Sequence, residues 1–588
     1  MLSKWMKSWV LAEIHPNLNF RKLFYHEDIS LWWLNDYPLV TSYDYRFRKI
    51  FFLILSLERI IDKEKPDEII ILNKTRDYQN EILELFCQAK SIKTTFIRHY
   101  RHSRSFRDRI IALIKPVYSI LMIYETMARA IFTKLLNFFH YTVRKKGNLS
   151  ILLLTFINSF KSRYDHARKK LVFTEFIMSS VMTYLARQHD LMVLLGVSPF
   201  SFLKMFKELL IRPSNCFYLD GHVNLTTCRK ILQASQIFKE RWKILEKNDN
   251  FIRIFSFKGV SLWPLYKEHV SRIFHFGILR TIKMFEAARN MLVRKNPDVL
   301  LFASENTVVG KILCYHAKKL NKPVIGIQHG EITVNDYDYF HPLKEEHAFL
   351  PTYMFTMGNH FKELLITQAR FPESNVITTG LPRFDLIWAQ KKFFNSREFR
   401  SQLGIKPEEK VLVFTTQNKF FNEMKKDILM ILKALKDVPT VRLIIKTHPH
   451  ESTERYENFL AMNGISNVPV LRNVNLYELY DASDFVITRT STTATEAILM
   501  DKNLILIRKL EGHFDYEVQN QYLPYSVASV VANSDDLALS LKKILSDPEY
   551  VQEMKKNRNN FIKDHCFSFD GMSTKRIVQQ IEKIARDV

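Results

Sequence analysis

Two short polar segments in the last third of the chain carry residues suited to binding phosphate. Lys446 and His448 lie in the first of them, KTHP, which follows the apolar run VRLII. Lysine and histidine both donate hydrogen bonds to phosphate oxygens, and the proline would rigidify the turn that aims the imidazole. We expect His450 and Glu451, which follow, to be solvated.

The second segment is a run of hydroxyl residues from Thr490 to Thr493, between the strand-like DFVITR and the helical ATEAILM. Free N–H groups, hydroxyls and the positive dipole end make a helix N-terminus a cradle for phosphate. We therefore expect Ser491, Thr492 and Thr493 to bind phosphate. Glu496 could reach the ribose hydroxyls of a nucleotide, although Thr493 and Glu496 also match a plain capping box.

A candidate acid or base lies earlier, in PDVLLFASENTVVGKILCYHAKKLNKPVIGIQHGEI. This segment is typical of strand, helix and strand, with Glu305 just after the first strand and His329 just after the second. Because parallel strands end at one edge of a sheet, the two side chains should be neighbours. Histidine can act as a general base near neutral pH, and Gly330 lets a ligand approach the backbone. Glu331 is a competing carboxylate, and a histidine that only caps the loop is the alternative.

The elements that must position these residues are short apolar runs separated by helix-length amphipathic segments. Runs rich in Val, Ile and Leu are typical of parallel strands covered on both faces. They lie at 149–157, 190–197, 298–304 and 323–328, and in a second series that begins at 410, 441, 484 and 503. The fold class we expect is α/β, with two Rossmann-like doubly wound domains preceded by an extra N-terminal α/β unit and a helical connector.

The length of 588 residues suits several domains of about 150 residues each. We expect an N-terminal α/β unit, a basic and apolar helical connector, two Rossmann-like domains and a C-terminal helix. Their predicted bounds are 1–100, 101–148, 149–388, 389–556 and 557–588.

The N-terminal unit partly repeats a later one. The tripeptide SLW stands 34 positions before PD both at Trp32 and at Trp263, and one offset of 231 residues relates the two pairs. Each pair is followed by a helical segment and another apolar run. This predicts a duplicated α/β unit, with chance similarity of two strand–helix–strand patterns as the alternative. The paired aromatics at Trp32 should be core.

Charge points to an anionic partner, because 86 Lys and Arg against 61 Asp and Glu give a net charge of +25. Basic clusters at 98–109 and 144–146 flank an apolar stretch that four charged residues interrupt, so no membrane span is expected. A basic-flanked helix on an anionic membrane surface is one interpretation. A helix pair packed on a neighbouring domain is the other.

Other patterns exclude several classes. Five scattered cysteines without CxxC argue against a disulfide framework or zinc ribbon. The N-terminus lacks the apolar run of a signal peptide, so we expect a cytoplasmic protein, peripheral on the inner face of the membrane where its connector binds lipid. Walker A and GxGxxG patterns are absent. The DxD at Asp336 and the polar HPLKEEH segment are read as loop, so no metal and no cofactor are expected.

The order of motifs resembles the GT-B fold glycosyltransferases of surface and capsular polysaccharide synthesis, the group that includes polysialyltransferase-like, Kdo transferase-like and CDP-glycerol glycerophosphotransferase-like enzymes. The resemblance rests on IGIQHG, FTMGNHFKELL, NVITTGLPRFD, KVLVFTTQ, IIKTHPHE and TSTTATEA, roughly between residues 255 and 510. It implies transfer of a sugar from a nucleotide-activated donor to a hydroxyl of a surface polysaccharide or lipid-linked glycan.

The same resemblance implies roles for individual residues. His448 with Lys446, and Ser491 with Thr492, would contact donor phosphates, Glu496 would contact the nucleotide, and His329 would face the acceptor. The acidic-acidic-Gly motif of polysialyltransferase-like enzymes is absent, so the base stays open between His329, Glu305 and Glu331.

Two other functions stay open. A sugar-nucleotide 2-epimerase-like enzyme would share the two-domain architecture and the helix that carries Ser/Thr and Glu. A basic nucleic-acid-binding protein would suit the charge, but no RNA or DNA module pattern is visible, and we expect no nucleic-acid partner.

Overall fold

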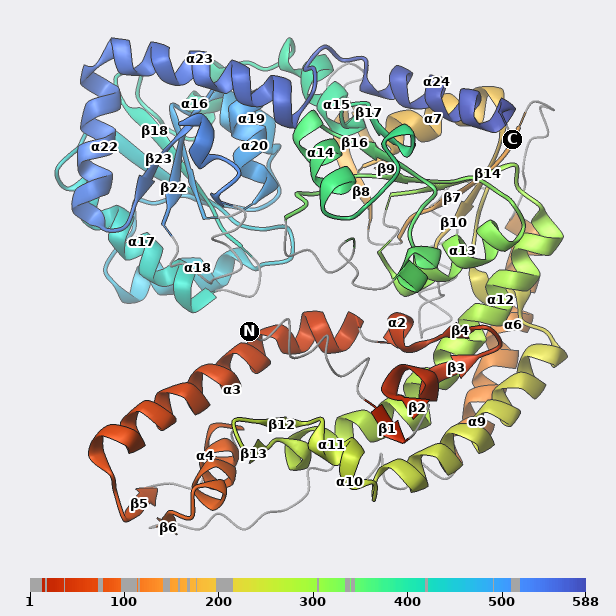
Figure 1. Ribbon diagram of the computed structural model, residues 1–588. Helices are drawn as coiled ribbons and strands as arrows, with labels where there is room; N and C mark the ends of the chain where they lie inside the picture. Colours follow the sequence, from red (N-terminus) through yellow and green to blue (C-terminus); the bar gives the residue numbers. More distant parts are fainter. Residues whose placement is uncertain are drawn as a thin grey trace.

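The computed structural model describes most of the chain (Figure 1). The described residues are 13–15, 18–35, 37–71, 78–96, 114, 117–140, 149–156, 159–165, 170–175, 177–196, 215–303, 306–333, 339, 344–417, 421–489, 491–508 and 519–587.

The first large sheet has seven parallel strands in the order β11-β10-β7-β14-β15-β16-β17. Its four central apolar runs are buried as predicted, because helices cover both faces of the sheet. The strands are β7 (Ser150–Leu154), β10 (Asp190–Leu194), β11 (Cys216–Phe217), β14 (Val299–Phe302), β15 (Val324–Ile327), β16 (Tyr353–Thr356) and β17 (Val376–Thr378). The connecting helices include α7 (Ser179–Gln188), α9 (Leu225–Leu245), α13 (Val308–Lys319) and α14 (Asn359–Thr367).

The second large sheet has six parallel strands in the order β20-β19-β18-β21-β22-β23. The strands are β18 (Lys410–Thr415), β19 (Val441–Lys446), β20 (Val470–Leu471), β21 (Phe485–Thr488), β22 (Asn503–Ile507) and β23 (Ala528–Val531). Its helices are α17 (Phe421–Leu435), α18 (Thr453–Met462), α19 (Leu476–Asp481), α20 (Thr492–Leu499) and α22 (Ser534–Ser546). The chain winds outward from β18 in one direction and from β21 in the other. The sheet therefore has a switch point between β18 and β21, and the expected α/β doubly wound fold class is confirmed.

The C-terminal segment ties the two sheets together. α23 (Pro548–His565) runs along the second half, and α24 (Ser573–Arg586) lies beside α7 on the first half (Figure 1). A Cβ built on Gly358 would lie 2.2 Å from the carbonyl oxygen of Asp564, and one on Gly380, at φ +78°, would lie 2.5 Å from Oγ of Ser573. Only glycine admits such close approach.

The predicted duplication is confirmed in the secondary structure. The hairpin of β3 (Tyr25–His26) and β4 (Ile29–Ser30) recurs 231 residues later as β12 (Ser256–Phe257) and β13 (Val260–Ser261). The long helix α3 (Tyr37–Glu64) and its counterpart, α11 (Trp263–Arg272) continued through a π-helical turn into α12 (Ile278–Lys295), end at the same offset. So do β5 (Glu68–Ile71) and β14, and β6 (Lys93–Phe96) and β15, with α4 (Tyr78–Ala89) and α13 between them.

The two copies pack against each other reciprocally. Glu27, at the first hairpin tip, pairs with Arg289 on α12 at 2.7 Å, and Lys258, at the second tip, pairs with Glu58 on α3 at 3.0 Å. These two ion pairs join equivalent positions with reversed charges. The rings of the equivalent Phe20 and Phe251 stack at 5.7 Å. Reciprocal contact between equivalent positions is the geometry of an isologous dimer, here within one chain.

One acidic cluster in this interface has the composition of a metal site. His26, Glu27 and Glu286 bring their ligand atoms within 4.8 Å of one another. Lys230 and Arg289 pair with the carboxylate of Glu286 at 3.0 and 2.8 Å, and with that of Glu27 at 3.0 and 2.7 Å. The two cations already neutralise the carboxylates, so the cluster is an ion-pair network.

The remaining elements connect these units. The connector contains α6 (Tyr118–His140), and none of the described helices combines the length and apolar character that crossing a bilayer requires. All five cysteines are buried thiols without a disulfide. The other elements are β1 (Glu13–His15), β2 (Leu18–Asn19), α2 (Trp32–Asn35), the hairpin β8 (Phe160–Asp165) and β9 (Lys170–Glu175), α10 (Asp249–Arg253), α15 (Pro382–Lys391) and α16 (Ser396–Gln402).

Candidate active site

The predicted phosphate-binding segments lie at the carboxyl edge of the second sheet, beside its switch point. KTHP follows β19 and the hydroxyl run follows β21, and β18 lies between these two strands. Neighbouring strands are about 4.8 Å apart, so the two turns begin roughly 10 Å from each other. A crevice at such a switch point is where doubly wound sheets bind ligands.

The imidazole of His448 is oriented by its own turn. The backbone N–H of His450 donates to Nδ1 of His448 at 3.2 Å. Nδ1 is therefore the acceptor and Nε2 carries the proton of the neutral ring. The backbone N–H of His448 donates to Oγ1 of Thr416 at 3.0 Å, which fixes the turn to the end of β18. The ring is half-buried.

Glu451 anchors the same turn, and the prediction that it is solvated is wrong. Its side chain is 4 % exposed. The carboxylate accepts hydrogen bonds from the hydroxyls of Thr416 and, at 2.7 Å, Tyr456, and from the backbone N–H of His448 at 3.3 Å. Several donors offset the cost of burying a carboxylate. His450 is exposed, as predicted.

Lys446 brings a buried cation to this edge. Its ammonium donates to the carbonyl oxygen of Thr447 at 2.8 Å. Burial, helped by the nearby charge of Arg472, lowers the pKa of Lys446 to about 8. An anionic ligand would favour the charged form of this lysine.

Helix α20 begins as predicted at the hydroxyl run. Oγ of Ser491 accepts the N–H of Thr493 at 3.3 Å, so Ser491 is the N-cap. Ser491, Thr492 and Thr493 are all half-buried. Oγ1 of Thr493 lies 3.2 Å from Oγ1 of Thr415 at the end of β18. The predicted capping box is wrong, because Thr493 is already inside the helix.

Glu496 is buried in an ion pair that the sequence analysis missed. Nη2 of Arg383, on α15, lies 3.1 Å from Oε1 of Glu496, and Tyr477 donates its hydroxyl to the same oxygen at 3.1 Å. Burial raises the pKa of Glu496, and the guanidinium of Arg383 opposes this. Arg383 lies in the motif NVITTGLPRFD, whose Asp385 also accepts the backbone N–H groups of Ser573 and Thr574 at the start of α24.

Glu331 joins the two halves. It follows β15 of the first sheet, and its Oε1 accepts the hydroxyl of Thr495 on α20 at 2.9 Å and that of Tyr522 at 3.3 Å. Its other oxygen is buried. Burial raises the pKa of this carboxyl group, although the two hydroxyls oppose the shift. A carboxylate of raised pKa suits proton transfer near neutral pH.

The loop that carries His329 is held by Gln328. The side-chain amide of Gln328 donates to the carbonyl oxygen of Gly330 at 2.9 Å and accepts the N–H of Met357 at 2.9 Å. His329 is half-buried, and a Cβ built on Gly330 would meet no atom within 4 Å. Space for a ligand therefore adjoins this loop. Glu305, like Asp336 and the first three residues of HPLKEEH, lies outside the described residues.

Comparison with known families identifies the chain. The model of the UDP-N-acetylglucosamine 2-epimerase family matches residues 281–582. The chain belongs to this family. The match begins within α12 and so covers the later part of the second copy, both sets of predicted site residues and most of the C-terminal segment. Among curated proteins, none matches the chain.

Membership of the 2-epimerase family corrects the predicted activity. The main interpretation, a glycosyltransferase, is wrong, and the alternative of a sugar-nucleotide 2-epimerase-like enzyme is the one the family supports. The polysialyltransferase-like or Kdo transferase-like group is not confirmed. The motifs could not separate the two activities, because both need a site for a nucleotide diphosphate.

Solved structures with a similar chain path include members of the same family. The 2-epimerase of Neisseria meningitidis bound to UDP-GlcNAc is 15% identical, with 74% of this chain and 99% of that chain covered and a TM-score of 0.45. The 2-epimerase of Methanocaldococcus jannaschii is 15% identical, with 74% and 99% covered and a TM-score of 0.44. A glycosyltransferase of Rickettsia africae is 12% identical, with 75% and 99% covered and a TM-score of 0.42.

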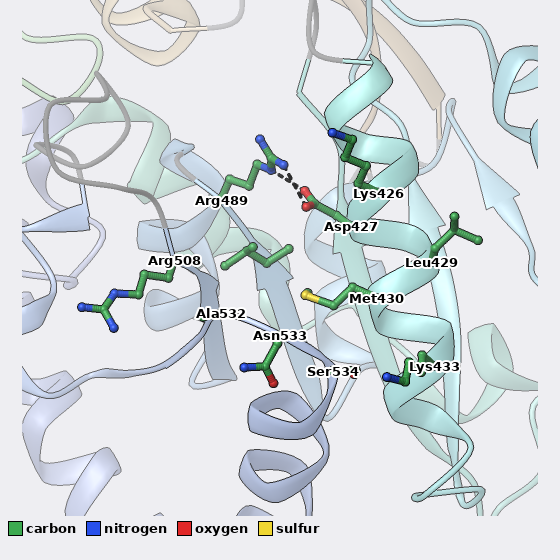
Figure 2. Close-up of a pocket in the computed structure, with 11 residues that line it drawn as sticks. Lys426, Asp427, Leu429, Met430, Lys433, Arg489, Arg508, Ala532, Asn533 and Ser534 are labelled. Carbon is green, nitrogen blue, oxygen red and sulfur yellow. Dashed lines mark hydrogen bonds and ion pairs between the residues drawn. The ribbon is translucent and has the colours of Figure 1, made fainter. Parts of the chain in front are cut away.

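A separate cavity of about 540 Å³ lies between α17 and α22 of this 2-epimerase family member. Figure 2 shows the guanidinium of Arg489 directed at Asp427, with Nη2 2.8 Å from Oδ1. Glu423 also pairs with Arg489. None of the predicted site residues lines this cavity; the lining residues are Lys426, Asp427, Leu429, Met430, Lys433, Arg489, Ile507, Arg508, Ala532, Asn533 and Ser534.

Proposed function

We propose that the protein inverts the configuration at C2 of a UDP-linked N-acetylhexosamine. The family supports this substrate class and reaction. The observation that carries the proposal is the contact of Glu331 with Thr495, because it sets a proton-transfer group of one half against the helix whose N-terminus can hold a diphosphate. The sugar would then lie between the two halves.

The chemistry of inversion explains why both halves are needed. The proton on C2 of a hexose is not acidic, so its removal is easiest when the bond from C1 to the diphosphate oxygen breaks as well. The electron pair of the C2–H bond then forms a C1–C2 double bond, and the diphosphate carries away the negative charge. Return of the diphosphate to C1 and of a proton to the opposite face of C2 completes the inversion.

The leaving diphosphate needs donors that hold its charge. We assign this role to Lys446, His448, Ser491, Thr492 and Thr493, which combine a cation, an imidazole N–H and the start of a helix. The diphosphate must stay bound while the sugar is unsaturated. A cradle fixed to three strand ends is suited to retaining it.

Proton transfer on C2 is assigned to the first half. Glu331, whose pKa is raised by burial, and His329 are the two described candidates, and Glu305 stays a prediction. Glu496 has a positioning role in this proposal, because its contact with Arg383 and Tyr477 fixes the inner end of α20.

Hydrogen exchange tests the proposal. The protein is incubated with UDP-GlcNAc in D₂O, and proton NMR should show deuterium entering C2 together with formation of the C2 epimer. Glu331→Gln should slow exchange by about a thousandfold while UDP still binds, and Ser491→Ala with Thr492→Ala should weaken binding of UDP. UDP-GlcNAc that binds without any exchange at C2 would disprove the proposed reaction.

A further inference from the structure

The helix α6 presents an exposed apolar stripe. Its exposed positions follow one another at alternating steps of four and three residues, so they share one face of the helix. The four most exposed of its large side chains are Tyr124 at 71 %, Ile131 at 55 %, Leu135 at 53 % and Phe138 at 81 %. The full stripe is Val117, Leu121, Tyr124, Ala128, Ile131, Leu135 and Phe138. Exposed apolar surface of this extent marks an interaction site.

The opposite face of α6 packs against the rest of the protein. Met122, Ala130 and Leu136 are buried, and α6 contacts α9 and the short helical turn at Leu219–His222. The stripe is therefore not needed for the core of the protein. Its apolar residues point away from the first half, where a separate partner can reach them.

The connector that contains the stripe is strongly basic in sequence. Within α6 itself, Lys134 is exposed and Arg129 is buried. Between residues 98 and 148 the sequence holds eleven Lys and Arg against two acidic residues.

The positive charge of this segment indicates which partner the stripe binds. A second copy of the chain would bring an equally basic segment against the first, since a two-fold interface sets equivalent surfaces face to face. The single carboxylate on α6, Glu125, is held by Arg129 at 2.9 Å. An anionic lipid surface offers both negative headgroups and an apolar layer. Tyr124 and Phe138 supply the aromatic rings common in helices that lie at such an interface.

We infer that α6 lies along an anionic lipid surface, with its stripe from Val117 to Phe138 in the headgroup–acyl boundary, and that the net positive charge of the sequence from 98 to 148 draws it to that surface. The helix lies on the membrane and does not cross it. This inference stands apart from the proposed 2-epimerase reaction, since no residue of the candidate active site is on α6.

Vesicle flotation tests the inference with the full chain. The protein should float with phosphatidylcholine vesicles that contain phosphatidylglycerol, float far less with phosphatidylcholine alone, and lose binding steeply as salt rises. Ile131→Asp with Leu135→Asp should reduce the bound fraction by about tenfold or more. The matched control is Met462→Asp with Leu539→Asp, which changes the charge equally at sites that are 87 % and 70 % exposed on other helices. It should bind as the native chain does.

A labelling experiment gives a second test in case the aspartate variants do not fold. Because all five native cysteines are buried, Phe138→Cys gives one reactive thiol for an environment-sensitive dye. The emission should shift to the blue with anionic vesicles, and the dye on Met462→Cys should not respond. No shift at position 138, equal flotation with neutral vesicles, or a dimer in light scattering that the α6 variants dissociate would each overturn the inference, the last in favour of a second copy.

Discussion

The two copies of the repeated unit share a local structure and differ in what surrounds it. In the later copy, β14 and β15 are entirely buried and lie in the middle of a seven-stranded sheet. In the earlier copy, β5 and β6 pair only with each other among the described strands, and Ile70 is 58 % exposed. The same strand–helix–strand pattern thus serves as sheet centre in one place and as a peripheral element in the other.

Only the later copy leads into a described loop of the candidate site. It continues directly into the loop of Gln328 to Glu331, which contacts the second half. Both copies contribute their hairpin and long helix to the interface between them. In the proposed function, the later copy therefore has a catalytic role in addition to the structural role that the two copies share.

The largest expected effect is on catalysis and separates the copies by role. Glu331→Gln, at the end of the later copy, should lower deuterium exchange at C2 of UDP-GlcNAc by about a thousandfold, as expected for loss of a general base. Thr95→Val in β6 of the earlier copy should leave the rate within about twofold, because Thr95 bonds only to Glu68 in the neighbouring strand among the residues described. A comparable loss in both variants would refute the division of roles.

The next effect is on stability and compares equivalent strand residues. Leu301 in β14 is fully buried, and Ile70 in β5 occupies the equivalent position. Leu301→Ala should lower the free energy of unfolding by about 3 kcal/mol, whereas Ile70→Ala should cost less than about 1 kcal/mol. Urea unfolding of both variants gives the comparison. Equal losses would mean that β5 is covered in solution.

A smaller effect depends on pH and again distinguishes the copies. His316 on α13 stands where the earlier copy has Leu85, and burial, helped by Arg289, lowers the pKa of His316 to about 4. Between this pKa and about 6.5 the unfolded chain binds the extra proton, so acid favours unfolding in that window. His316→Leu should therefore remove on the order of 2 kcal/mol of the stability lost between pH 7 and pH 4. Unfolding curves at the two pH values test this, and an unchanged pH dependence would contradict it.

The smallest effect concerns the reversed ion pairs. Glu58→Lys adds a cation beside Lys258 and Lys90, both of which pair with Glu58, and should cost at most about 1 kcal/mol, because both lysines are exposed. Adding Lys258→Glu should restore most of the loss, since the charges are then exchanged. Thermal unfolding of both single variants and the double variant measures the coupling. Strictly additive losses would show that the pair contributes nothing.

Local pattern was enough to predict the strands and the polar turns that follow them. The apolar runs predicted β7, β10, β14 and β15, and the hydroxyl run predicted the start of α20. These features depend on residues that are adjacent in sequence. The repeat offset of 231 residues was visible from two short matches.

Contacts between distant residues could not be predicted in this way. The ion pair of Arg383 and Glu496 joins residues more than a hundred positions apart, and Glu451 is buried because Thr416 and Tyr456 supply hydroxyls to it. Neither partner is marked by its neighbours in sequence. The activity was misassigned for a related reason. Residues that can donate hydrogen bonds to a diphosphate indicate the leaving group, but they do not indicate which reaction the sugar then undergoes.

The two glycines that receive the C-terminal segment restrict how the halves can separate. Gly358 and Gly380 both belong to the first half and touch Asp564 and Ser573 of the tail, while α23 is packed along α20 and α22 of the second half. The C-terminal segment thus packs against both halves, one on each side of the crevice. If the crevice widens to admit a sugar nucleotide, this C-terminal segment has to bend or detach from one half. Shortening the chain from its end should therefore let the two halves move apart before it unfolds either sheet.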